Sequence, residues 1–120
     1  MLENSFYHIQ SLEQEDGVVK ADFTLDAAHP IFHGHFPGQP VVPGACMLQI
    51  EKELLEKAIG STVQLTKAIN IKYIAHITPD MACAMRIQYV VKEEGVDITG
   101  VITANGQACY KSKSKYSSLS

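Results

Sequence analysis

The chain has 120 residues, of which 46% are hydrophobic and 19% charged, and this composition predicts a single domain over residues 1–120. Its 10 basic and 13 acidic residues give a net charge of −3, which argues against nucleic acid or an anionic membrane as the partner. No stretch is long enough to predict a membrane span, and the opening residues MLENSFYHIQ do not resemble a signal peptide. Three cysteines without CxxC spacing favour reduced thiols, so we expect a cytoplasmic protein.

The first part of the chain predicts a hairpin followed by a long loop. Residues 6–26 read as two strands around Asp16-Gly17, a dipeptide typical of hairpin turns. Periodicity is lost over residues 26–44, where four prolines and three glycines predict a structured loop. A loop of this length inside a compact domain usually carries function.

The rest of the chain predicts one helix and then a meander of strands. Residues 45–59 place apolar side chains at helical spacing, and Gly60 is a typical helix stop. The predicted apolar stripe consists of Cys46, Met47, Leu48, Ile50, Leu54, Leu55 and Ala58. Strands are predicted over residues 63–77, 81–93, 96–106 and 107–115. The polar, basic residues 112–120 are expected to fray. We therefore expect an α+β fold, with an antiparallel sheet curled around a central helix.

The loop and the start of the helix together suggest chemistry on an acyl group. The prolines restrict the loop, so that it can hold a side chain still. Gly44 begins the helix, where unpaired N–H groups and the helix dipole would polarise a carbonyl oxygen that approaches closely. His35 lies on the loop, and the ordinary pKa of histidine suits proton abstraction. These parts suit removal of a proton α to a thioester or another acyl carbonyl.

The histidines also allow less specific interpretations. A lone histidine on a loop is more often a hydrogen-bonding scaffold residue than a base. His29, His33 and His35 invite a metal-site interpretation, but they lack a carboxylate or a cysteine at ligand spacing, so we expect no metal. His8 and His76 fall in predicted strands and are expected to be structural or surface residues.

One segment resembles a known family. GHFPGQPVVPG, from Gly34 to Gly44, resembles the active-site signature of the hotdog-fold 3-hydroxyacyl-(acyl-carrier-protein) dehydratases, the FabZ and FabA group. Every fixed position of the pattern G-H-F-P-G-x-P-x-x-P-G is present. The order of strands, loop, central helix and sheet is similar as well. The resemblance implies a hotdog fold, in which a curved antiparallel sheet wraps around one long helix.

The resemblance also implies a reaction and a partner. His35 would abstract the C2 proton of a 3-hydroxyacyl thioester, and the Gly44 N–H would bind the thioester carbonyl. Phe36, Pro43 and Ala45 are the other substrate-binding candidates. The substrate would be carried on the phosphopantetheine arm of an acyl carrier protein, with no metal or organic cofactor. The family implies a homodimer or a larger homo-oligomer, whose sites combine the histidine of one chain with a helix carboxylate of another.

The chain departs from the family at that carboxylate. The family acid lies fourteen residues after the histidine, and here this position is Gln49. An amide donates hydrogen bonds but does not titrate, and removal of a general acid typically costs about 10²–10⁴-fold in rate. Glu51 is about 200° around the helix from Gln49 and would face the opposite side. Glu53 lies one turn further on, where it is either an acid acting through water or a solvated charge.

Three functional interpretations follow. The first is a dehydratase-like protein that acts on 3-hydroxyacyl carrier thioesters, with His35 as base and Gln49 orienting the leaving group or a water. The second is a hotdog thioesterase, which would release free thiol. The third is a catalytically impaired acyl-carrier-binding subunit that pairs with an active dehydratase chain.

Overall fold

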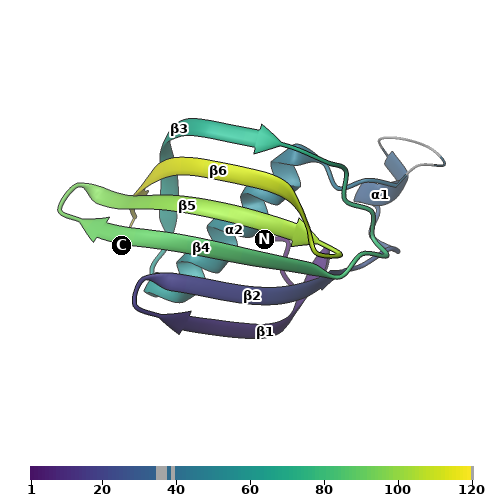
Figure 1. Cartoon of the computed structure of the whole chain (residues 1–120), viewed down its shortest axis with the longest axis horizontal. Coiled ribbons are helices and arrows are strands. Elements are labelled where there is room, and N and C mark those ends of the chain that lie inside the picture. Colours follow the sequence, from purple (N-terminus) through teal and green to yellow (C-terminus); the bar gives the residue numbers. More distant parts are fainter. Residues whose placement is uncertain (35–37, 39, 120) are drawn as a thin grey trace.

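An antiparallel sheet curls around the helix α2 in the computed structural model, which describes residues 1–34, 38 and 40–119 (Figure 1). The described strands are β1 (Tyr7–Glu15), β2 (Val18–Leu25), β3 (Val63–Tyr73), β4 (Cys83–Lys92), β5 (Gly95–Ala104) and β6 (Gln107–Ser118). The short helix α1 (Ile31–Gly34) and the long helix α2 (Gly44–Ile59) stand between β2 and β3. The predicted α+β hotdog architecture is confirmed.

The strand order, β1-β2-β4-β5-β6-β3, differs from a simple meander. β3 pairs with β6 and forms an edge of the sheet, so it does not adjoin β4, the next strand in the chain. Two register shifts, at Leu65/Lys67 and Ala68/Asn70, interrupt its ladder with β6, and such bulges bend a strand. β3 also ends at Tyr73, earlier than predicted, and residues 74–77 run on outside any strand.

The expected fraying of residues 112–120 is wrong. Residues 112–118 belong to β6, which is hydrogen-bonded to β5 on one side and β3 on the other. The buried residues Tyr110, Ser112, Ser114 and Tyr116 alternate with exposed lysines along this strand. The serines made the segment look too polar for a core strand, although its period of two residues is that of a half-buried strand.

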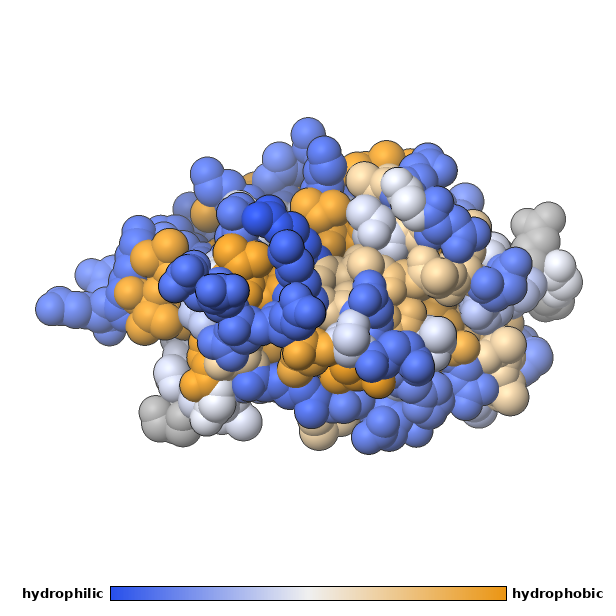
Figure 2. Space-filling model, turned by 60° about the horizontal axis from the view of Figure 1, so that its bottom comes forward, coloured by the Kyte–Doolittle hydropathy of each residue, from blue (hydrophilic) through white to orange (hydrophobic). Residues whose placement is uncertain are grey.

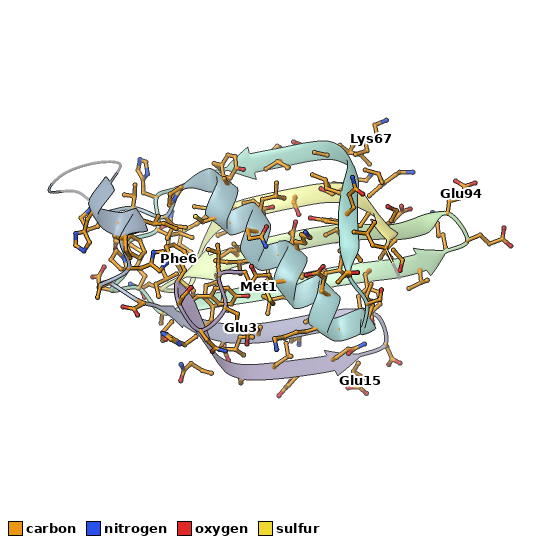
Figure 3. The ribbon with its side chains drawn as sticks, turned by 180° about the vertical axis from the view of Figure 1, so that it is seen from behind. Met1, Glu3, Phe6, Glu15, Lys67 and Glu94 are labelled. Carbon is orange, nitrogen blue, oxygen red and sulfur yellow. The ribbon has the colours of Figure 1, made fainter. Side chains whose placement is uncertain are left out.

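The core lies between α2 and the inner face of the sheet. The inward side chains of β2 alternate as predicted, and Val19, Ala21 and Phe23 are buried. Most of the predicted apolar stripe of α2 is buried too, whereas Leu48 and Ala58 are half-buried. α2 runs diagonally across the inner face (Figure 3). It ends at Gly60, which has a left-handed φ of 71° and whose N–H donates to the Glu56 carbonyl.

Large exposed apolar side chains are concentrated in two places. Val90 and Val91 are 59% and 66% exposed near the turn between β4 and β5, and Figure 2 shows orange side chains at the left end of its view. Ile69, Tyr73 and Ile74 follow the edge strand β3, with 42–53% of each side chain exposed. An edge strand with this composition is a natural surface for a further chain.

A buried carboxyl group joins α2 to the sheet. Glu51 is fully buried, and its Oε1 accepts a hydrogen bond from the Tyr110 hydroxyl at 3.1 Å. Its Oε2 lies 2.5 Å from the Ser112 hydroxyl. Gly100 of β5 leaves the room for this carboxyl group, because a Cβ added at Gly100 would lie 1.9 Å from Glu51 Oε2. The glycine therefore serves close packing between strand and helix.

We predict that Gly100→Ala lowers the free energy of unfolding by about 1–3 kcal/mol, because the Glu51 carboxyl group must leave its hydrogen bonds. Chemical denaturation of wild type, Gly100→Ala, Glu51→Ala and the double variant measures the coupling. In the Glu51→Ala background, the cost of Gly100→Ala should fall below about 1 kcal/mol. An equal cost in both backgrounds would contradict this account of Gly100.

Candidate functional site

The N-terminus of α2 presents unpaired donors. Its N-cap, Pro43, is extended, with φ −62° and ψ 147°, and provides no side-chain cap. The Pro43 carbonyl accepts hydrogen bonds from the N–H groups of Cys46 and Met47. Among the described residues, no acceptor is bonded to the N–H groups of Gly44 or Ala45. Two donors and the positive end of the helix dipole therefore meet at this point.

A groove of about 430 Å³ opens at this helix terminus. One wall is formed by residues 41–44 with Met47, and the other by residues 73–76. The Val42 N–H donates to the Ile77 carbonyl at 2.8 Å and ties the two walls together. A Cβ on Gly44 would lie 2.8 Å from the ring of Tyr73, so the absence of a side chain lets this ring lie against the helix start. The groove can thus hold an acyl carbonyl close to the free N–H groups.

The structure brings some of the predicted site residues together at the groove. Pro43 and Gly44 line the groove, and the exposed Ala45 follows them on the first turn. His35 and Phe36 lie outside the described residues. Gln49 does not line the groove and is half-buried elsewhere on the helix.

Gln49 instead contacts Glu53, one turn further along α2. The Gln49 amide Nε2 donates to Glu53 Oε2 at 2.8 Å. Glu53 is 1% exposed, so its interpretation as a solvated charge is wrong. Its Oε2 also accepts from the Leu2 N–H at 2.8 Å, while its Oε1 accepts from the Glu3 N–H at 2.9 Å and the Tyr7 hydroxyl at 3.0 Å. The first residues of the chain are thereby held against α2 (Figure 3).

These four hydrogen bonds decide the charge of Glu53. Burial alone would raise the pKa of this carboxyl group, but the hydrogen bonds from Leu2, Gln49, Glu3 and Tyr7 outweigh burial and hold the pKa below its ordinary value. An ionised carboxylate only accepts hydrogen bonds. Gln49 must therefore turn its NH₂ group toward Glu53, and its carbonyl oxygen points elsewhere as an acceptor.

The pKa of Glu51 is shifted in the opposite direction from that of Glu53. It faces the sheet rather than the side of Gln49, as the helical spacing predicts. Burial raises the pKa of Glu51, and the hydrogen bonds from Ser112 and Tyr110 offset this only in part. One helix thus carries a buried carboxyl group whose pKa is raised by burial and another whose pKa is lowered by its hydrogen bonds.

The described histidines have separate roles. His29 accepts a hydrogen bond from the Ile31 N–H at its Nδ1, and its ring lies edge-on to Phe6. His8, in β1, lies 3.8 Å from Asp26. His76 is exposed on the wall of the groove, beyond the end of β3, where the sequence predicted a strand. Within residues 1–34, 38 and 40–119, no three histidine, cysteine or acidic side chains are grouped as metal ligands.

Sequence reasoning missed three residues of this region. Tyr73 and His76 were assigned to a strand, and no pattern marked them as groove residues. Glu53 was considered only as an acid or a solvated charge, although its spacing of four from Gln49 is the spacing at which helical side chains meet. Its other partners come from the start of the chain and have no sequence signal.

Comparisons with known proteins agree with this arrangement. Residues 10–113 match the ApeI-like family, described as ApeI dehydratase. A 3-hydroxyacyl-(acyl-carrier-protein) dehydratase FabZ of Haemophilus influenzae is 31% identical over 108 residues, covering 79% of this chain and 70% of the relative. The dehydratase heterocomplex ApeI:P from Xenorhabdus doucetiae contains a similar chain, with a TM-score of 0.79, 18% identity and coverage of 92% and 96% of the two chains. A hypothetical thioesterase with coenzyme A from Streptococcus pneumoniae has a TM-score of 0.68 at 15% identity, covering 98% of this chain and 91% of the other.

The sheet wrapped around α2 and the structural neighbours define a hotdog fold. The chain belongs to the ApeI-like, FabZ-related family of hotdog dehydratases. No helix in the described ranges has the length and apolar character needed to cross a bilayer.

We predict opposite pH effects for the two buried carboxyl groups. The lowered pKa of Glu53 gives stability that is present above the ordinary pKa of 4.5 and is lost as the pH falls through the folded-state value. Glu53→Gln should therefore cost about 1–3 kcal/mol at pH 7, and less at acid pH. The raised pKa of Glu51 has the reverse effect, so Glu51→Gln should gain relative to wild type as the pH rises above 4.5.

Urea denaturation between pH 4 and pH 8 measures how each substitution changes the free energy of unfolding. The two variants lie on the same helix, so each is the matched control of the other. Parallel pH curves for the two variants would contradict the opposite pKa shifts of Glu51 and Glu53.

Proposed function

We propose that this protein acts on 3-hydroxyacyl thioesters of acyl carrier protein as a dehydratase-like enzyme in fatty-acid or related acyl-chain synthesis, in the cytoplasm. The observation that carries the proposal is the groove at the uncapped start of α2, which directly follows the GHFPGQPVVPG segment. In the proposed site, His35 is the base and the Gly44 N–H binds the thioester oxygen. Phe36, Pro43 and Ala45 complete the substrate-binding segment.

The proposed reaction is an elimination of water. His35 removes the C2 proton, and negative charge develops on the thioester oxygen, where the Gly44 N–H and the helix dipole stabilise it. The C2–C3 double bond then forms as the C3–oxygen bond breaks, and the departing hydroxyl leaves as water with the proton that His35 removed from C2, relayed through a water molecule. Gln49 contributes its carbonyl oxygen, which accepts a hydrogen bond from the leaving hydroxyl or from the water that delivers the proton.

The proposed site requires a second copy of the chain. Gln49 lies away from the groove of its own chain, so a site that uses both His35 and Gln49 combines two chains. The apolar edge strand β3, with Ile69, Tyr73 and Ile74 exposed, supports pairing along that edge. We propose a homodimer, or a larger assembly built from it.

We expect His35→Ala to abolish formation of 2-enoyl product from a 3-hydroxyacyl carrier thioester. His76→Ala is the matched control, because His76 lies on the groove wall but outside the proposed chemistry. This control should retain turnover within about threefold of wild type, well below the 10²–10⁴-fold cost of losing a base. Equal loss in both variants, or none in His35→Ala, would sink the role given to His35.

We expect Gln49→Glu to increase turnover about 10²-fold or more, because it supplies a general acid. Glu53 keeps its hydrogen bonds from Leu2, Glu3 and Tyr7 and remains ionised, so the new carboxyl group beside it holds a proton and has a raised pKa. The added turnover should then fall as the pH rises through that raised pKa. A folded Gln49→Glu protein with unchanged or lower turnover at every pH would refute this role of position 49.

A second candidate is a catalytically impaired subunit that pairs with an active dehydratase. It is favoured by Gln49 and by the similar chain in the ApeI:P heterocomplex. In this case, purified protein would bind acyl carrier protein without turnover, and a Glu-bearing homologue would co-purify with it. Release of free thiol in the same assay would instead identify a thioesterase.

A further inference from the structure

Tyr73 places its hydroxyl group at the groove, beside the start of α2. It is the last residue of β3, and its ring forms part of the groove wall. A Cβ added at Gly44 would lie 2.8 Å from both Cε1 and Cζ of this ring and 3.2 Å from its hydroxyl oxygen. The polar end of the ring, rather than its base, therefore lies against Gly44. A carbonyl oxygen that accepts from the Gly44 N–H would thus have the Tyr73 hydroxyl as a close neighbour.

The hydroxyl of Tyr73 is available to a bound molecule. The hydroxyls of Tyr7, Tyr89 and Tyr110 are hydrogen-bonded to other side chains, and the Tyr116 hydroxyl is buried in the core. Within residues 1–34, 38 and 40–119, no group is hydrogen-bonded to the Tyr73 hydroxyl. The side chain of Tyr73 is 53% exposed, so a molecule in the groove can reach it.

Contacts with Tyr110 hold the ring of Tyr73 in place. The two residues pair across β3 and β6, and their rings are tilted at 51° with centroids 5.7 Å apart. Tyr110 is itself buried, and its hydroxyl donates to the buried Glu51 at 3.1 Å. A donor that is already in position needs no reorganisation when charge develops on a substrate. The ring of Tyr73 is thus anchored to the core on one side and open to the groove on the other.

The surroundings of Tyr73 keep its hydroxyl protonated. Partial burial of the phenol and the nearby Glu51 carboxyl group both raise the pKa of Tyr73 above its ordinary value. The hydroxyl therefore remains a hydrogen-bond donor at neutral and moderately alkaline pH. The same shift makes loss of its proton costlier, so Tyr73 suits binding of an oxygen rather than protonation of the leaving hydroxyl.

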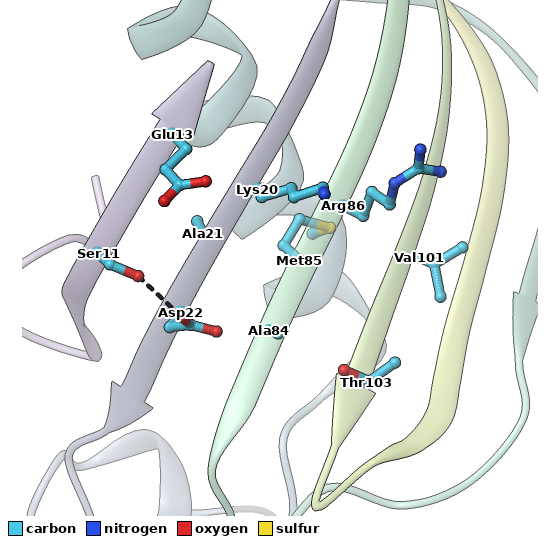
Figure 4. Close-up of a pocket in the computed structure, with 10 residues that line it drawn as sticks. All are labelled: Ser11, Glu13, Lys20, Ala21, Asp22, Ala84, Met85, Arg86, Val101 and Thr103. Atoms are coloured by element: carbon cyan, nitrogen blue, oxygen red, sulfur yellow. Dashed lines mark hydrogen bonds between the residues drawn. The ribbon is translucent and has the colours of Figure 1, made fainter. Parts of the chain in front are cut away.

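A hollow of similar size over the sheet is built differently. It has a volume of about 440 Å³ and lies over β1, β2, β4 and β5 (Figure 4). Among its described lining residues are the cationic side chains of Lys20 and Arg86, but no tyrosine and no residue of α2. The Ser11 hydroxyl at this hollow already donates to Asp22 at 2.8 Å. The groove at α2, with an uncharged hydroxyl beside free N–H groups, is therefore the better place for a carbonyl oxygen.

We propose that the Tyr73 hydroxyl donates a hydrogen bond to the thioester carbonyl oxygen, next to the Gly44 N–H, and is a further catalytic residue. This inference rests on the proposed function. As His35 removes the C2 proton, negative charge grows on that oxygen, and a hydrogen bond to a charged acceptor is stronger than one to a neutral acceptor. Tyr73 keeps its own proton throughout, so it leaves the balance of the elimination unchanged.

Tyr73→Phe tests the proposal, because it removes the hydroxyl and keeps the ring. We expect kcat for 2-enoyl formation to fall about 10–10²-fold with KM within about threefold of wild type, since this hydrogen bond strengthens in the transition state. The unfolding temperature should equal that of wild type, because no hydrogen bond in the described part of the chain is lost. Tyr89→Phe is the matched control, because its hydroxyl is bonded to Gln14 and it does not line the groove. This control should keep kcat within about twofold of wild type.

Infrared difference spectroscopy measures the same hydrogen bond without turnover. The probe is a 2-enoyl pantetheine thioester labelled with ¹³C at C1, whose carbonyl band moves to lower wavenumber when the oxygen accepts hydrogen bonds. On binding, this band should move further in wild type and Tyr89→Phe than in Tyr73→Phe.

The proposal would be overturned by a Tyr73→Phe protein whose kcat stays within about twofold of wild type, or by an equal loss in Tyr89→Phe. A bound carbonyl band that is the same with and without the Tyr73 hydroxyl would overturn it as well. Failure of the proposed function would appear differently. Wild type would then give no 2-enoyl product, while the carbonyl band of the bound thioester would still depend on Tyr73.

Discussion

The carboxylate of Glu53 fixes the relation between the start of the chain and the helix that carries the site. It is buried, yet four donors from three parts of the chain satisfy it. The cost of burying a charge is offset only when its hydrogen bonds are complete, so Leu2, Glu3, Tyr7 and Gln49 are held together. The face of α2 on which the family places its acid is thereby tied to a structural carboxylate. The orientation of Gln49 follows from this network.

The structure supports the two tasks of the proposed reaction, binding the thioester carbonyl and protonating the leaving hydroxyl, to different degrees. At the groove, the helix start has no side-chain cap, and the missing Cβ of Gly44 lets the ring of Tyr73 lie against it. In the proposed function, a carbonyl oxygen would meet the free N–H groups there. At Gln49, the structure offers an acceptor held by an ionised neighbour. In the proposed reaction, the helix start would stabilise an enolate-like oxygen, whereas delivery of a proton to the leaving hydroxyl would depend on water or on a partner chain. The donors at the helix start favour the dehydratase-like enzyme, and the missing acid at position 49 favours the catalytically impaired subunit.

Much of the fold could be predicted from sequence because its signals are local. The Asp16-Gly17 turn, the alternation of β2 and the apolar stripe of α2 each follow from short-range periodicity. The position of β3 beside β6 depends on pairing between distant segments, which composition does not encode. The burial of Ser112 and Ser114 had a local signal in the period of two residues, but their polar side chains obscured it. The start of α2 at Gly44 could be predicted from the Pro43-Gly44 dipeptide. The partners of Glu53 could not, because they involve backbone N–H groups that every sequence possesses.

The central claim is that Glu53 stays ionised and thereby determines what position 49 can do. The most direct measurement is a ¹³C NMR titration of the glutamate side-chain carboxyl groups in wild type and Gln49→Glu. We predict a Glu53 pKa below its ordinary value in both proteins, and a carboxyl group at position 49 that titrates above the ordinary value. A Glu53 that takes up the proton first, leaving position 49 ionised at neutral pH, would contradict the account.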